Sequence, residues 1–254
     1  MRAIKLRLNL ADILFVLSAV FVLADKIVFQ TPGAKSYFPR SVQKKGVIIP
    51  NPISDRLPDA YHGERDRRVV NFCRIAPQKN LKVLLDAFDF FFREYPDYTL
   101  DIYGIVSDGA PYKAELEAYA KTLSAAESIR FYPGCADVHQ KIIQANMFVS
   151  SSDYEGIFNS MLEAMAIGLP VIVTDCANGG ERMCIQDGKN GLIVPRRDAK
   201  AMAEAMILVA ENEDFAYSVS TEAAKIRNRF SQDEIFCKWK EVIKQMCLEG
   251  GMKS

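Results

Sequence analysis

Short apolar segments alternate along this chain with longer segments in which apolar residues recur every three or four positions. The short segments predict strands, at residues 69–75, 99–103, 129–132, 147–150, 170–174 and 192–194. The longer segments predict helices, at residues 81–95, 112–123, 138–145, 160–167 and 199–211. Strands and helices in this order are typical of a parallel sheet covered on both faces. The pattern therefore predicts an α/β fold with a doubly wound, Rossmann-like sheet.

The segments before and after this pattern predict further parts of the chain. Residues 47–53 contain Pro50, Asn51 and Pro52, and residues 56–68 are polar with a proline and a glycine, which predicts a linker at 46–66 before a domain at 67–230. After that domain, Ser231 and Glu234 have the spacing of a capping box. This spacing predicts a C-terminal helix and tail over residues 231–254.

The N-terminal residues 1–45 contain an apolar run at 13–23, followed by a predicted strand at 26–30. Basic residues precede the run, as in a signal peptide, but Asp12 interrupts them. The run is also shorter than the roughly 20 residues that cross a bilayer. A helix that packs with a further domain fits this segment better than export, and contact with a membrane surface is a second interpretation.

Composition excludes several classes of protein. With 49% hydrophobic and 25% charged residues, the 254-residue chain can form an ordinary globular core. Lys plus Arg and Asp plus Glu number 32 each, so no overall positive charge favours nucleic acid. The six cysteines lack the paired spacing of a metal site, which predicts free, buried thiols in a reducing cytoplasm.

Two glutamates flank the start of the helix predicted at 160–167. Glu155 follows the strand at 147–150, and Glu163 lies about one turn inside the helix. Both carboxylates can therefore face a crevice at the carboxyl end of that strand, beside the free N–H groups of the helix. The N–H groups suit a phosphate and the carboxylates suit a sugar diol. The alternative is a solvated helix that carries two glutamates.

Two cations lie at and just after the end of the first strand of the predicted sheet. Arg74 and Lys79 precede the helix that begins near residue 81. The carboxyl ends of parallel strands lie at one edge, so these cations are predicted near Glu155. A guanidinium and an ammonium together suit a diphosphate. Gly179 and Gly180, after the strand at 170–174, could approach a ligand at the same edge, whereas residues 187–191 are equally well explained as a tight turn.

In combination these motifs resemble the retaining glycosyltransferases of the GT-B fold, known as family 4 or group 1. The motifs are Arg74-x4-Lys79, Glu155-x7-Glu163, the run Ala-Met-Ala-x-Gly-x-Pro-Val-Ile at 164–172 and Asp-Gly-x-Asn-Gly-Leu-Ile-Val-Pro at 187–195. Within that family the motifs most resemble those of bacterial polysaccharide hexosyltransferases. The resemblance begins near residue 24 and reaches the C-terminus.

The resemblance implies a role for each site residue. Arg74 and Lys79 would bind the donor diphosphate, Glu155 would contact the transferred sugar, and Glu163 would bind the ribose. Residues 130–135 would lie along the base of the nucleotide. The further residues expected to contact the donor are Gly156, Ile157, Phe158, Asn159, Tyr132, Gly134, Gly179 and Gly180. The catalytic residues would be Glu155, Arg74 and Lys79.

The reaction implied is hexose or N-acetylhexosamine transfer, with retention, from a nucleoside diphosphate sugar. A UDP-sugar is favoured, and the acceptor would be a glycan or an undecaprenyl-linked saccharide in cell-surface polysaccharide biosynthesis, at the cytoplasmic face of the membrane. No cofactor or metal is expected, because the cations stabilise the leaving phosphate and the sequence has no Asp-x-Asp triplet. His62 and His139 are given no chemical role.

The sequence also departs from the family pattern. Cys73 stands where a glycine usually precedes the arginine, and Asn159-Ser160 replaces the more common Gly-Leu; both changes leave less room for phosphate close to the backbone. Residues 1–45 would be a remnant of the N-terminal acceptor domain that family members carry. The C-terminal helix, which would contact that domain, is expected to expose an apolar face and to favour association.

Two other classes stay open from the sequence. One is a non-catalytic nucleotide-sugar-binding module, which the short N-terminal part favours. The other is a sugar-nucleotide epimerase or phosphorylase of related fold, against which the Glu155 and Glu163 motif argues. The donor sugar, base, acceptor, linkage and oligomeric state are not determined by the sequence.

Overall fold

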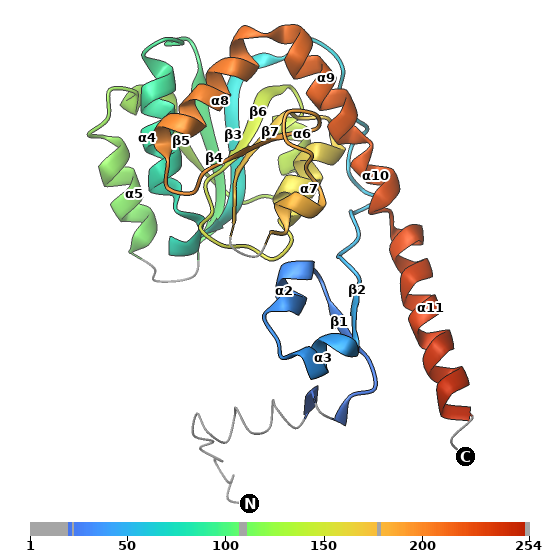
Figure 1. The fold of residues 1–254 in the computed structure, drawn as a ribbon. Coiled ribbons are helices and arrows are strands. Elements are labelled where there is room, and N and C mark those ends of the chain that lie inside the picture. Colours follow the sequence, from blue (N-terminus) through green and yellow to red (C-terminus); the bar gives the residue numbers. More distant parts are fainter. Residues whose placement is uncertain (1–19, 22, 107–110, 177–178, 252–254) are drawn as a thin grey trace, which may run out of the picture.

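The main body of the molecule is a six-stranded parallel sheet. The computed structural model describes residues 20–21, 23–106, 111–176 and 179–251 (Figure 1). The strand order is β5–β4–β3–β6–β7–β8. The strands are β3 (Asp66–Ile75), β4 (Thr99–Val106), β5 (Ile129–Pro133), β6 (Ala145–Ser150), β7 (Val171–Thr174) and β8 (Leu192–Val194). The predicted α/β, Rossmann-like fold is confirmed.

Helices cover both faces of this sheet (Figure 1). One face packs against α4 (Leu81–Phe92), α5 (Tyr112–Ala120) and α8 (Ala199–Glu211). The other packs against α6 (Val138–Ile142), α7 (Asn159–Ala166) and α10 (Ile226–Arg229). Helix α9 (Glu213–Ala224) contacts both α8 and α7. Short 3-10 turns complete the body: η1 (Pro77–Lys79), η2 (Ala126–Ser128) and η3 (Glu181–Met183).

Neighbouring residues of the central strands belong to different cores, because side chains alternate across a sheet. Val69 and Met147 are fully buried on the α4 side, whereas Val70 and Phe148 are fully buried on the α7 side. This double burial explains why the strands appear in the sequence as continuous apolar runs.

The direction of strand addition reverses between β3 and β6. From β3 the chain adds β4 and β5 on one side, and from β6 it adds β7 and β8 on the other. Loops that leave these two strands diverge, and ligands of doubly wound proteins bind in the crevice that this creates. The predicted cations lie at the end of β3 and in the turn after it, and Glu155 follows β6.

A small unit precedes the main body. Strands β1 (Ile27–Phe29) and β2 (Gly46–Ile48) form a parallel pair, connected through α2 (Pro32–Ser36) and α3 (Arg40–Lys44). Their core contains Ile27, Phe29 and Val42. The strand predicted at 26–30 is therefore confirmed, whereas the apolar run at 13–23 lies largely outside the described residues.

Several element boundaries differ from those predicted. Strand β2 lies inside the predicted linker. Helix α6 ends at Ile142 rather than 145, because Ala145 pairs with Asp66 as part of β6. Helices α9 and α10 were not predicted. The proposed domain limits at 1–45, 46–66, 67–230 and 231–254 stay predictions.

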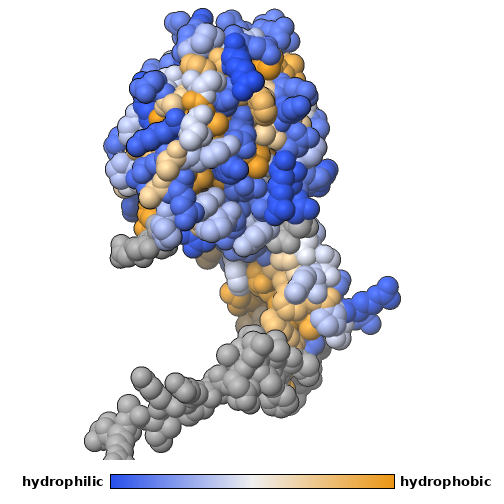
Figure 2. Space-filling model, turned by 90° about the vertical axis from the view of Figure 1, so that its left-hand side faces the viewer, coloured by the Kyte–Doolittle hydropathy of each residue, from blue (hydrophilic) through white to orange (hydrophobic). Residues whose placement is uncertain are grey.

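The C-terminal helix α11 (Gln232–Gly251) extends away from the main body (Figure 1). Ser231 Oγ accepts a hydrogen bond from the Glu234 N–H at 3.2 Å, which confirms the predicted cap. Exposed apolar side chains follow along the helix, at Phe236, Trp239, Ile243, Met246 and Leu248. On the side of the molecule seen in Figure 2, hydrophilic residues dominate the main body, and hydrophobic residues gather on the narrower part beneath it. In the described part of the chain, no helix has the length and apolar character to cross a membrane.

Hydrogen bonds from Arg65 connect the amino end of β6 to the surrounding loops. Its guanidinium donates to the carbonyl oxygens of Ala145 at 2.9 Å, Tyr61 at 3.0 Å and Gly168, and to Ser220 Oγ at 3.1 Å. Burial lowers the pKa of Arg65 to about 10. The planar guanidinium meets this set of acceptors with its fixed array of donors.

We expect Arg65→Lys to lower the free energy of unfolding by about 2–3 kcal/mol, because an ammonium group cannot reach all these acceptors and leaves buried carbonyls unpaired. Urea unfolding followed by circular dichroism measures the change. Arg56→Lys, at an exposed position, is the matched control and should shift stability by less than about 0.5 kcal/mol. Equal effects of the two substitutions would show that the Arg65 contacts contribute little.

Candidate functional site

Two loops meet at the reversal of strand order. The β3–α4 loop contains η1 and Asn80, whose φ of 44° places it in the left-handed region. The β6–α7 loop begins at Ser151, whose hydroxyl donates to the Lys79 carbonyl at 3.0 Å. The Asp153 N–H donates to the Gln78 carbonyl at 2.9 Å. These contacts hold the two loops together.

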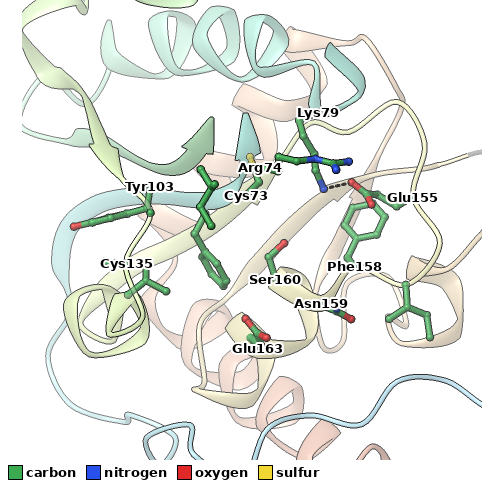
Figure 3. Close-up of a pocket in the computed structure, with 15 residues that line it drawn as sticks. Cys73, Arg74, Lys79, Tyr103, Cys135, Glu155, Phe158, Asn159, Ser160 and Glu163 are labelled. Carbon is green, nitrogen blue, oxygen red and sulfur yellow. Dashed lines mark hydrogen bonds and ion pairs between the residues drawn. The ribbon is translucent and has the colours of Figure 1, made fainter. Parts of the chain in front are cut away.

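Lys79 and Glu155 form an ion pair between these loops (Figure 3). The side chains are 15% and 11% exposed, so water screens the pair only partly. Ser152 Oγ also donates to Glu155 Oε1 at 3.0 Å. The sequence predicted these charges at one edge of the sheet, and the structure brings them into direct contact.

A pocket of about 320 Å³ opens beside this ion pair (Figure 3). That volume lies at the lower end of the range for small-molecule sites. Its walls come from the ends of β3, β4 and β5 and from the start of α7, and consist of Phe72, Cys73, Arg74, Lys79, Tyr103, Ile105, Gly134, Cys135, Val138, Glu155, Ile157, Phe158, Asn159, Ser160 and Glu163. Arg74 and Lys79 lie at one side, and Glu163 lies lower on α7 (Figure 3).

Eight of the twelve predicted site residues line this pocket: Arg74, Lys79, Gly134, Glu155, Ile157, Phe158, Asn159 and Glu163. Tyr132 lies behind the wall, where its ring stacks on Tyr103 at 4.8 Å between ring centroids. Gly180 packs on the β6–α7 loop, since a Cβ there would lie 1.7 Å from the Gly156 carbonyl oxygen. Gly179 has a φ of +60° and open space around it. The roles predicted for all twelve residues stay predictions.

His139, which the sequence analysis set aside, contacts one of the site residues. Its Nε2 lies 3.0 Å from Glu163 Oε2. No motif in the sequence predicts this contact, because His139 lies on α6 and Glu163 on α7 and the contact depends on how the two helices pack.

Gln30 and Asn51 also reach the site from outside the predicted domain. The Gln30 side-chain amide donates to Asn51 Oδ1 at 2.8 Å, and the Asn51 amide donates to Asn159 Oδ1 at 3.4 Å. The small N-terminal unit is thus connected by side chains to the first residue of α7. No motif in the sequence marked either residue.

Cys73 occupies the position where the resemblance expected a glycine, and its side chain lines the pocket. Burial raises the pKa of this thiol to about 12, so it is uncharged at neutral pH. All six cysteines lie in the described residues and are free, as predicted, but the expectation that they are buried is wrong for Cys237 and Cys247, which are exposed on α11.

Asp153 anchors the β6–α7 loop to the loop after β8. It accepts hydrogen bonds from Arg197 Nε at 3.0 Å and Nη2 at 2.9 Å, and from the Asn80 amide at 3.2 Å. The hydrogen bond with Arg197 is the main reason that the pKa of Asp153 is lowered. Arg197 has a φ of 60°, which few residues other than glycine adopt. The loop that carries Glu155 is therefore fixed from two sides.

The family model described as glycosyl transferases group 1 matches residues 57–228, more than half of the chain. The chain belongs to this family. The matched region contains both loops of the site and all twelve predicted site residues, so the resemblance drawn from the motifs is confirmed at the level of the family.

Curated relatives of this family member are longer than the chain. The putative glycosyltransferase EpsD of Bacillus subtilis is 30% identical over 184 residues, which are 72% of this chain and 47% of EpsD. An uncharacterized glycosyltransferase of Haemophilus influenzae is 22% identical over 220 residues, 86% of this chain and 61% of the relative. The chain thus spans about half to three-fifths of the length of these proteins.

Solved structures share the fold. HepE of Anabaena, in complex with UDP, has a TM-score of 0.84 at 18% identity, over 94% of this chain and 69% of HepE. The pneumococcal O-GlcNAc transferase GtfA, in complex with UDP and GlcNAc, has a TM-score of 0.76 at 23% identity, over 89% of this chain and 47% of GtfA. At such identities the likeness establishes the fold.

Glu181 is a buried carboxylate behind the site of this family member. Its side chain is fully buried, and Oε1 accepts a hydrogen bond from the Cys176 N–H at 3.0 Å. No group in the described residues pairs with Oε2. Burial is the main cause that raises the pKa of Glu181 to about 7, and Asp175 adds to it.

The pKa of Glu181 predicts a pH-dependent loss of stability. The folded protein holds the proton more tightly than the unfolded chain, so the protonated carboxyl favours folding at low pH, and this contribution is lost as pH rises through about 7. Relative to Glu181→Gln, which does not titrate, the wild type should lose up to about 3 kcal/mol between pH 5 and pH 8. Urea unfolding across this range measures the difference, with exposed Glu127→Gln as control. Parallel stability curves for wild type and Glu181→Gln would contradict it.

Proposed function

We propose that the pocket binds the nucleoside diphosphate sugar of a retaining hexosyltransferase, with UDP-sugars as donors. The observation that carries this proposal is the convergence of Arg74, Lys79, Glu155 and Glu163 on one pocket where the strand order reverses. Two cations and two carboxylates in such a crevice match a ligand that has both a diphosphate and sugar diols.

The cationic side of the pocket suits the diphosphate. Arg74 can donate a bidentate pair of hydrogen bonds to phosphate oxygens, and Lys79 adds an ammonium group. Helix α7 contributes its N-terminus, where the cap residue Phe158 makes no side-chain hydrogen bond to the first N–H groups. In the reaction these groups stabilise charge that develops on the leaving diphosphate, a contribution of about 3 kcal/mol for each well-placed donor.

The carboxylates suit the two sugars of the donor. Glu155 lies beside the cations and contacts the transferred hexose or N-acetylhexosamine, while Glu163 lies farther along α7 and binds the ribose. The Gly134 and Cys135 turn then lies along the base. The acceptor hydroxyl attacks from the face that the diphosphate leaves. No metal or other cofactor enters the proposal, because Arg74 and Lys79 supply the positive charge.

The acceptor we propose is a glycan or an undecaprenyl-linked saccharide in cell-surface polysaccharide biosynthesis, at the cytoplasmic face of the membrane. Relatives support this class: one is the amylovoran biosynthesis glycosyltransferase AmsK of Erwinia amylovora, and another is the poly(glycerol-phosphate) alpha-glucosyltransferase of Bacillus subtilis. An N-terminal GT-B domain would complete the acceptor side. Donor binding without turnover, as in a non-catalytic module, is the alternative that assays of transfer distinguish.

Calorimetric titration with UDP and GDP tests the donor site. We expect one nucleotide, UDP, to bind to the wild type, and the double variant Arg74→Ala, Lys79→Ala to lose at least about 100-fold in affinity, because two charge-assisted contacts to phosphate disappear. The control double variant Arg56→Ala, Lys200→Ala removes exposed cations outside the pocket and should bind as the wild type does. A folded wild type that binds neither nucleotide refutes the donor site.

Glu155→Gln separates binding of the diphosphate from binding of the sugar. In the wild type, Lys79 must break its ion pair with Glu155 before it can contact phosphate, and this costs free energy. The variant has no such ion pair, so its affinity for UDP should rise about threefold to tenfold. A UDP-sugar should gain less, because the hydroxyl contacts of Glu155 are lost. Calorimetry with UDP and UDP-glucose measures both, and exposed Glu127→Gln is the control. Weaker binding of UDP itself would contradict the proposed exchange of partners.

A further inference from the structure

The two carboxylate oxygens of Glu163 have different surroundings. Oε2 lies 3.0 Å from His139 Nε2, whereas Oε1 has no hydrogen-bond partner among the residues that the structure describes. An ionised carboxylate only accepts hydrogen bonds, so Nε2 carries the proton in this contact. One oxygen is therefore occupied by the imidazole, and the other is available to a ligand.

The position of the His139 ring is fixed by packing. Phe72, which is almost fully buried, meets the ring edge to face, with ring centroids 5.4 Å apart and an angle of 84° between the planes. Phe72 in turn packs on Phe148, which is fully buried at the centre of the sheet. His139 is thereby connected to the rigid core, and only 18% of its side chain is exposed.

Apart from His139, no residue in the described part of the chain gives the Glu163 carboxylate a hydrogen bond. A glutamate side chain has three rotatable bonds, and 29% of this one is exposed at the pocket. A hydrogen bond from a fixed donor to one oxygen removes most of this freedom before a ligand arrives. Groups that are held in their binding geometry lose less entropy when a ligand binds.

We propose that His139 is a positioning residue for the ribose subsite: it holds Oε2 of Glu163, so that Oε1 faces the ribose diol of the nucleotide. His139 does not itself touch the ligand in this arrangement, and it is absent from the lining of the pocket. The role depends on the nucleotide site proposed above, because without a ribose there is nothing for the oriented carboxylate to bind. Histidine at this position then contributes to the choice of ribonucleotide donors.

Two ligands and two variants test this role by calorimetry. UDP carries both ribose hydroxyls, and 2′,3′-dideoxy-UDP has the same base and diphosphate without them. His139→Leu removes the donor, whereas His139→Gln keeps a side-chain N–H that can reach Glu163. We expect His139→Leu to bind UDP about tenfold more weakly but dideoxy-UDP unchanged, and His139→Gln to bind UDP within about threefold of the wild type.

Two controls separate this role from simple packing. His62→Leu replaces the other histidine, which lies outside the pocket, and should leave both affinities unchanged. In a Glu163→Gln background, His139→Leu should add less than about a twofold loss for UDP, since coupled residues do not contribute independently. Circular dichroism and thermal unfolding confirm that each variant is folded.

The outcomes are distinguishable. Equal weakening of UDP and dideoxy-UDP by His139→Leu would mean that the imidazole only shapes the pocket, and unchanged binding of UDP would mean that Glu163 needs no support; either result overturns the inference while the donor site stands. Failure of His139→Gln to restore binding would also overturn it. If the folded wild type binds no UDP, the proposed donor site is refuted, and the role of His139 with it.

Discussion

The candidate site depends on the contact between Lys79 and Glu155. The two residues lie 76 positions apart in sequence, yet they meet because β3 and β6 are neighbours in the sheet. Exposed ion pairs contribute little, but this pair is mostly buried and is accompanied by hydrogen bonds between the two loops, so its charges interact through less water. The contact brings a cation and a carboxylate together at the reversal of strand order, beside the pocket.

The sequence was sufficient to predict this edge of the sheet. Continuous apolar runs predicted the strands, and the rule that parallel strands end at one edge placed Arg74 and Glu155 together. The sequence could not predict contacts between side chains of different elements. Tyr132 stacks on Tyr103 because the register of β4 and β5 sets them opposite each other, and no sequence pattern fixes register between strands 29 residues apart. The contact of His139 with Glu163 likewise depends on how α6 packs beside α7, and a lone histidine on a short helix gives no sign of it.

The segment expected to be a linker proves to be part of the site's surroundings. Asn51 lies between Pro50 and Pro52, and the proline that follows it favours an extended backbone at Asn51. Its side chain can therefore be presented in a constant direction, toward Gln30 on one side and Asn159 on the other. Because Asn159 begins α7, these hydrogen bonds connect the N-terminal unit to the helix that carries Glu163. Nearby, Ile53 and Leu57 are buried in the core of the main body, so the segment that follows Asn51 is fixed to that body.

Helix α11 is packed against the main body at its start and exposes apolar side chains farther along. At its start, Ile235 is 3% exposed, and the preceding Phe230 carbonyl accepts a hydrogen bond from the Ile53 N–H at 2.8 Å, so the first turn belongs to the main body. Farther along, Phe236, Trp239 and Ile243 recur at spacings of three and four residues and are 43–66% exposed. Most of a helix's stability comes from packing such an apolar face, and little from the helix alone. The later turns of α11 therefore gain stability from contact with another surface.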